Sequence, residues 1–240
     1  MAKSSSRSLA DGGEVSPGVT SRAARESAIN EARRTLILDA ARSAFFELGL
    51  DGASLREIAK RAGYTPGALY SYFGSREALY AALLGESLAR LRQCVVEAAG
   101  NGDSSAQPGE AGALLHARAM AFFCFYRARP QDMDLGFYLF NGTQPRGLTP
   151  ELNQQLNDQL RAALLPIQEA LLTLGLSADA AVIETTAIFA HAVGLLMLNN
   201  SGRIRLFRQD PQVLFGRFLD LLLARLGTEK RQPTGFAPRG

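Results

Sequence analysis

The chain has 240 residues, of which 47% are hydrophobic, and a formal net charge of +3 at pH 7. This hydrophobic content excludes a disordered chain, and the length allows one or two compact domains. The two cysteines, Cys94 and Cys124, are too few for a disulfide framework or a Cys-based zinc site. We therefore expect a folded cytoplasmic protein with reduced thiols, and the mildly basic balance is only a weak pointer to a polyanionic partner.

Residues 1–26 are rich in serine, glycine and charge without apolar periodicity, which predicts a flexible arm. Its basic residues are not followed by an apolar run, so a secretory signal is not predicted. Arg22 and Arg25 could contact a DNA backbone, with a solubilising tail as the alternative. The longest apolar stretch, Ala187 to Leu198, is interrupted by His191 and is too short to cross a bilayer, so we expect no membrane partner.

The first predicted helix runs from about Ser27 to Leu48, where apolar residues recur at helical spacing, and Gly49 is expected to end it. The stretch from Ser54 to Phe73 then predicts two short helices. Ser54 and Glu57 have the spacing of a capping box, in which each side chain bonds the other residue's backbone N–H.

A tight turn separates these two short helices. Gly63 is expected to end the first, and Thr65 followed by Pro66 favours the start of the second. A connection of about three residues is typical of a helix-turn-helix.

The rest of the chain predicts further helices and no strand with alternating polarity. These helices are expected at 76–98, 114–126, 149–174 (with a kink at Pro166), 177–200 and 210–226, with a shorter apolar segment at 137–140. The predicted fold is all-α, with about nine helices: an N-terminal three-helix bundle with a helix-turn-helix, and a C-terminal helical bundle. We expect an N-terminal arm (1–26), a DNA-binding domain (27–76), an effector-binding and dimerisation domain (77–227) and a tail (228–240).

The block from about Arg33 to Leu84 resembles the TetR/AcrR family of bacterial transcriptional regulators. The resemblance is carried by FFELGLDGASLREIAKRAGYTPGALYSYFGSREALYAALL, which contains Ala-Gly-Tyr, Leu-Tyr-Ser-Tyr-Phe and Ser-Arg-Glu-Ala-Leu in the family's order. Beyond this block the resemblance is only architectural. It implies binding to a double-stranded DNA operator, and a C-terminal domain that forms a homodimer and usually holds a small-molecule effector.

The outer face of the second short helix contains no Arg, Asn or Gln, the side chains that read bases in a bidentate manner. Arg56, on the preceding helix, is therefore our candidate base reader, with a phosphate contact or a solvated arginine as alternatives. The resemblance implies phosphate contacts by Tyr70, Tyr72 and Arg76, although the tyrosines could instead pack. The full candidate DNA-binding set is Ser54, Arg56, Lys60, Thr65, Pro66, Gly67, Ala68, Tyr70, Ser71, Tyr72 and Arg76.

The last two helices carry apolar stripes that could join two subunits, with packing inside one chain as the alternative. The candidate interface residues are Ile183, Ala187, Ala190 and Gly194 on one helix, and Leu214, Phe218 and Leu222 on the other.

Aromatic and flexible side chains of the C-terminal domain could line a cavity for an apolar or aromatic effector with one polar anchor. Most of them are expected to be ordinary core residues. The candidate effector-binding residues are His116, Met120, Phe123, Tyr126, Phe137, Tyr138 and His191, and Met197 is a further candidate.

The sequence contains no catalytic motif or metal-binding spacing, so we predict neither an enzyme nor a bound cofactor. The prediction is a dimeric, ligand-responsive transcriptional regulator, with repression favoured. Two alternatives stay open: a structural DNA binder without sequence preference, and a regulator that responds to oxidation of Cys94 and Cys124.

Overall fold

A computed structural model describes residues 17–98, 108–137 and 148–229. Within these ranges the chain forms nine α-helices and one 3-10 helix, and no strand occurs in them. The elements are α1 (Pro17–Gly52), α2 (Leu55–Ala62), α3 (Pro66–Tyr72), α4 (Arg76–Glu97), α5 (Pro108–Ala128), α6 (Pro130–Gly136), α7 (Pro150–Thr173), α8 (Ala178–Asn200), η1 (Arg203–Phe207) and α9 (Pro211–Glu229). The all-α prediction is confirmed.

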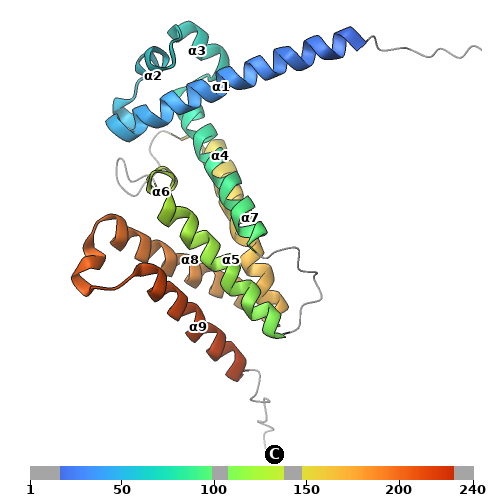
Figure 1. Ribbon diagram of the computed structural model, residues 1–240, viewed down its shortest axis with the longest axis vertical. Coiled ribbons are helices and arrows are strands. Elements are labelled where there is room, and N and C mark those ends of the chain that lie inside the picture. The colour runs from blue at the N-terminus through green and yellow to red at the C-terminus, as the bar shows by residue number, and fades with distance from the viewer. Residues whose placement is uncertain (1–16, 99–107, 138–147, 230–240) are drawn as a thin grey trace, which may run out of the picture.

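The first three helices form a small bundle in which α2 and α3 lie on one side of α1 (Figure 1). Ile37 and Phe45 of α1, Ile58 of α2 and Leu69 of α3 are almost completely buried in it. Burying side chains of this size stabilises the fold by about 1.5–3 kcal/mol each, which fixes α3 against the other two helices.

Helix α1 begins at Pro17, ten residues before the predicted start, so the predicted start of the first helix is wrong and the helix includes residues 17–26. Residues 22–33 are exposed on every side, and this part of α1 projects beyond the bundle (Figure 1). It lacks an apolar stripe, but it is rich in Ala, Arg and Glu, which favour helix, and Arg22 pairs with Glu26 at 3.0 Å. Residues 1–16 lie outside the described ranges.

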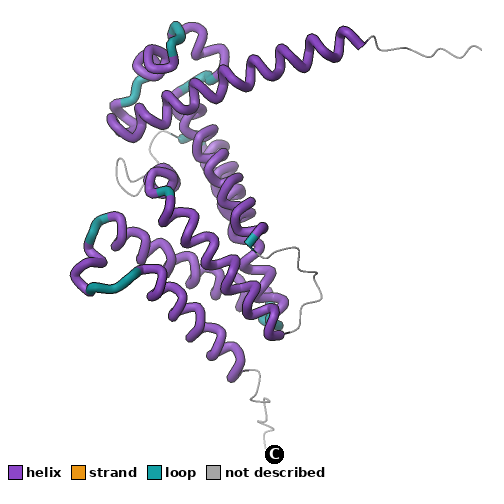
Figure 2. Tube along the Cα trace, in the orientation of Figure 1, coloured by secondary structure: helices purple, strands orange, loops and turns teal. Residues whose placement is uncertain are grey.

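Helix α4 connects the two halves of the molecule and packs along α7 (Figures 1 and 2). The predicted core helix is confirmed as α5, which contacts α4, α6, α7, α8 and α9. Its aromatic residues Phe122, Phe123 and Tyr126 are at most 1% exposed. Helix α7 continues through Pro166, whose carbonyl accepts a hydrogen bond of 2.6 Å from Arg118 Nη1.

Candidate nucleic-acid interface and ligand cavity

The helix-turn-helix is shaped by local capping contacts. The Ser54 hydroxyl accepts the backbone N–H of Glu57 at 3.2 Å, and the Thr65 hydroxyl accepts that of Ala68 at 3.2 Å. Gly63 ends α2 in a left-handed conformation with φ of 74°, and Pro66 occupies the first turn of α3. The predicted boundaries of both helices are therefore confirmed.

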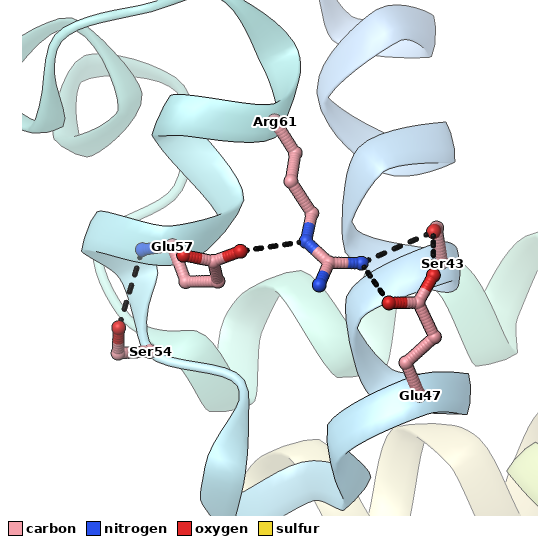
Figure 3. Close-up of polar contacts among 5 residues, drawn as sticks. All are labelled: Ser43, Glu47, Ser54, Glu57 and Arg61. Atoms are coloured by element: carbon pink, nitrogen blue, oxygen red, sulfur yellow. Dashed lines mark hydrogen bonds and ion pairs between the residues drawn. The ribbon is translucent and has the colours of Figure 1, made fainter.

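The reciprocal half of the predicted capping box is absent (Figure 3). The Glu57 carboxylate accepts a hydrogen bond of 2.9 Å from Arg61 Nε, and the Ser54 N–H instead donates to the Gly52 carbonyl at 3.1 Å. The turn before α2 already satisfies the Ser54 N–H, and the Glu57 carboxylate is taken up by the oppositely charged Arg61 one turn along the helix.

Arg61 joins α2 to α1 on the inner side of the helix-turn-helix (Figure 3). Its Nη1 lies 2.9 Å from Glu47 Oε2 and 3.2 Å from Ser43 Oγ. The hydrogen bond from Ser43 and the neighbouring Arg61 guanidinium hold the pKa of the Glu47 carboxyl below its usual range. The spacing of Arg61 to Glu57 is visible in the sequence, but the contacts of Arg61 to α1 depend on the tertiary fold and were therefore not predicted.

Replacing Glu47 with glutamine should remove a pH-dependent part of the stability. Because the folded-state pKa of Glu47 is lowered, its contribution is present above the unfolded-state pKa and is lost as the pH falls through the folded-state value. The melting temperature of E47Q should lie below that of the wild type at pH 7 and converge with it under acidic conditions. A difference that stays constant from pH 7 to pH 3 would contradict the role of this carboxylate.

Helix α3 turns one face inward and leaves the other open. Leu69 and the following Phe73 are 0% and 4% exposed, as predicted, while Tyr70 is 55% exposed and Gly67 and Ser71 are also exposed. A Cβ atom added at Gly67 would have open space around it. The Ser71 hydroxyl donates to the Ala68 carbonyl at 2.6 Å, so towards a ligand it offers only acceptor lone pairs.

The basic candidates flank this open face. Arg56 and Lys60 are exposed on α2, and Arg76, at the start of α4, is partly buried and pairs with Glu77 at 3.2 Å. Tyr72 is half-buried and packs against the core. Its ring can pack in this way while its hydroxyl still contacts a ligand.

A cavity of about 380 Å³ lies between α4, α7, α8 and the end of α5 with α6. Its lining is apolar except for Tyr126 and Asn157 and includes no charged side chain. Burial, together with the nearby charge of Asp132, raises the pKa of Tyr126, so its hydroxyl stays protonated at neutral pH. The lining residues are Leu84, Leu88, Tyr126, Gly136, Phe137, Leu156, Asn157, Leu160, Val193 and Met197.

Comparisons with known proteins agree with this geometry. Residues 37–83 match the family model described as bacterial regulatory proteins, tetR family. A 64-residue segment is 39% identical to the HTH-type transcriptional repressor AcnR of Corynebacterium efficiens, and one of the same length is 44% identical to the HTH-type transcriptional regulator UidR of Escherichia coli K12. These segments span 27% and 25% of this chain, and only 34% and 33% of the respective relatives.

Residues 37–83 therefore form a domain of the TetR family. Solved structures extend the likeness to the whole fold. The putative regulatory protein SCO4313 matches with a TM-score of 0.66 at 21% identity, over 81% of this chain and 98% of its own. A tetR family regulatory protein from Rhodococcus RHA1 matches with a TM-score of 0.59 at 22% identity, over 81% and 96%. At these identities the structures show that the C-terminal helices have the fold found in TetR proteins.

The structure brings only part of the predicted effector set to this cavity. Tyr126, Phe137 and Met197 line it, whereas Phe123 stacks on Phe215 with ring centroids 4.8 Å apart. The other described candidates also pack towards α9: His191 stacks on Phe218 at 4.1 Å, His116 lies 4.0 Å from Asp220, and Met120 lies beside Gly216. Tyr138 lies outside the described residues.

The lining residues that sequence reasoning missed are mainly leucines of α4 and α7, such as Leu84 and Leu156. Leucines at helical spacing line a core and a cavity equally well, so the sequence contains no signal that separates the two.

The predicted stripe on α8 is exposed along its full length. Ile183 is 65% exposed, and Ala187, Ala190 and Gly194 are exposed with it. On α9, by contrast, Leu222 is only 5% exposed, and Leu214 and Phe218 pack against the core of their own chain. Intrachain packing therefore accounts for much of the α9 stripe, and the exposed apolar residues of that helix are instead Val213 and Leu221.

The described cysteines and potential metal ligands give little support to a redox-sensing thiol or a metal site. Cys94 and Cys124 are half-buried, and burial raises the pKa of the Cys124 thiol, which is opposite to what a reactive thiolate needs. Within residues 17–98, 108–137 and 148–229, no three His, Cys, Asp or Glu residues form a group that could hold a metal ion.

Proposed function

We propose that this TetR family protein is a DNA-binding transcriptional repressor that acts in the cytoplasm as a homodimer and is released from a palindromic operator by a small apolar ligand. The main support is the open face of α3, held by the buried Leu69, within the segment that matches the tetR family model. Footprinting on DNA upstream of its own gene tests the proposal, and a protected two-fold site is the expected result. Protection of every sequence, with a steep salt dependence, would instead support a structural DNA binder.

We assign different roles to two arginines on this face. Arg56 is exposed near the start of α2 and free to reach a base edge, whereas Arg76 is partly buried and better placed for a fixed phosphate contact. Arg56→Ala should reduce discrimination between bases by about 1–3 kcal/mol at one base pair per half-site, while Arg76→Ala should weaken binding to all sequences alike. Binding measured on single-base operator variants separates them, and equal losses on all sequences for both variants would remove Arg56 as a reader.

Dimerisation is proposed through α8 and α9. Unlike the Ala187–Leu198 stretch alone, the whole of helix α8 has the length and apolar composition of a membrane span, yet only 33% of its most apolar window is buried. It nevertheless packs within the described fold against α5, α7 and α9, and Glu184 of α8 pairs with Arg225 of α9 at 2.6 Å. The small exposed side chains at Ala187, Ala190 and Gly194 would let a second α8 approach closely, so a second copy of this chain accounts best for the open face.

The effector is proposed to occupy the apolar cavity between α4 and α8. A transcriptional regulator FadR from Bacillus subtilis, crystallised in complex with stearoyl-CoA, has this fold with a TM-score of 0.60 at 19% identity, over 79% of this chain and 97% of its own. An uncharged lining of about 380 Å³ favours a hydrophobic ligand portion, with Asn157 and Tyr126 as polar anchors.

Val193→Phe should block ligand response by filling this cavity, because Val193 lies in its wall and is only half-buried. The thermal stabilisation by a medium-chain alcohol or acyl-CoA series should be lost in V193F and kept in V96F, a matched substitution at an exposed position of α4. Unchanged stabilisation of V193F would place the ligand elsewhere.

A further inference from the structure

A second hollow, of about 460 Å³, lies where the DNA-binding domain meets the C-terminal domain. Three arginines from separate elements line it: Arg42 of α1, Arg90 of α4 and Arg129 at the junction of α5 and α6. The remaining lining residues are Ala128, Pro130, Gln131 and Asp132. We call this hollow the arginine cleft.

The charges lining the arginine cleft do not balance. Asp132 is its one lining carboxylate, and Asp132 Oδ1 lies 3.1 Å from Arg90 Nη2. Arg42 Nη1 bonds to Asp39 Oδ1 at 2.7 Å, on the exposed side of α1 outside the cleft lining. Three guanidinium groups against these two carboxylates leave an excess formal charge of +1 at the cleft.

Most hydrogen-bond donors of these guanidinium groups are unused. Each group has five N–H donors, and the contacts above use one of Arg42 and one of Arg90. Arg129 stacks over the Phe125 ring at 4.8 Å and has no ion pair to any residue in the described ranges. Stacking fixes the plane of this guanidinium while leaving its N–H edges available, and such forks suit carboxylate and phosphate oxygens.

We propose that the arginine cleft binds a compact oxygen dianion, of the phosphate or dicarboxylate class. The excess positive charge attracts such a ligand, and its several oxygens can accept hydrogen bonds from three guanidinium groups at once. The side chains of Arg42 and Arg90 are 33% and 44% exposed, so a ligand can reach them from solvent.

The location gives the anion a mechanical role. Helix α1 separates the cleft from the reading face, because α6 lies on the side of α1 away from α2 and α3 (Figure 1). An anion held by Arg42 and Arg129 would join α1 to the C-terminal domain without touching the DNA-binding surface, and would restrict the orientation of α3. This regulatory consequence rests on the proposed function, whereas binding of the anion does not.

Calorimetric titration of the full chain with inorganic phosphate and, separately, with succinate tests the proposal at constant ionic strength set by NaCl. We expect saturable binding of at least one anion, weakened about tenfold or more in Arg129→Gln and in Arg42→Gln. Arg92→Gln removes the same charge from an exposed position of α4 that does not line the cleft, and should bind as the wild type does. Arg90 is left intact because its removal would leave the buried Asp132 carboxylate unpaired.

Each outcome decides the matter. If the wild type binds only one of the two anions, that anion identifies the ligand class, phosphate or dicarboxylate. Absence of saturable binding of either anion, or equal affinity of wild type, R129Q and R42Q, would overturn the site. If one glutamine variant fails to fold, the other is compared with the wild type. The titration contains no DNA, so its result does not depend on whether the protein is a transcriptional regulator.

Discussion

Gly67→Leu is expected to abolish specific operator binding while leaving the protein folded. Gly67 is exposed in the first turn of α3, and a Cβ atom added there would have open space around it. Leucine favours helix over glycine by up to about 1 kcal/mol, so the isolated domain should be no less stable. In the major groove, however, the new side chain would hold the helix away from the bases, and we expect affinity to fall on the order of 100-fold.

The comparison needs both melting curves and binding isotherms on one operator. Gly227→Leu is the matched control, because Gly227 is also exposed with no atom near its added side chain but lies at the end of α9. Normal operator affinity of G67L, with an unchanged melting temperature, would show that α3 does not enter the groove.

Ile183→Glu is expected to separate the dimer and thereby remove most of the operator affinity. Ile183 is 65% exposed, so the substitution should change the stability of the single chain by less than about 0.5 kcal/mol. In a dimer interface it would bury a carboxylate among apolar and small side chains, which costs several kcal/mol. Because two half-sites must be bound together, a monomer should retain only weak half-site binding.

Sedimentation velocity at micromolar concentration is the direct readout, with operator binding measured on the same samples. Leu165→Glu provides the control, since Leu165 is 45% exposed on α7, away from the proposed interface. A variant I183E that stays dimeric would exclude this face of α8 as the contact.

The sequence was most informative where structure depends on near neighbours. Ser54, Thr65, Thr149 and Ser177 all cap helices as their local sequence predicts, because a cap needs only the backbone N–H three residues later. Helix α1 shows the limit of this reasoning: its first turns carry no apolar stripe, so a reading based on periodicity missed a helix held by propensity and an Arg22–Glu26 pair.

Features that depend on several helices meeting were not predictable. Arg61 and Glu47 are 14 positions apart, and nothing in their local sequence indicates an ion pair. The cavity likewise arises where Leu84 of α4 and Leu156 of α7 meet Val193 of α8. In the sequence, each of these residues looks like an ordinary core residue of its own helix. Phe123, one of the aromatic residues that suggested a pocket, instead fills the contact between α5 and α9 by stacking on Phe215.

Selection of binding sites from random double-stranded DNA tests the central claim most directly. We expect enrichment of a two-fold symmetric sequence whose half-site centres lie about one helical turn apart, or a whole multiple of it. One position per half-site should lose its base preference in Arg56→Ala. Recovery of unrelated sequences without symmetry, bound equally well and released in parallel by salt, would contradict it.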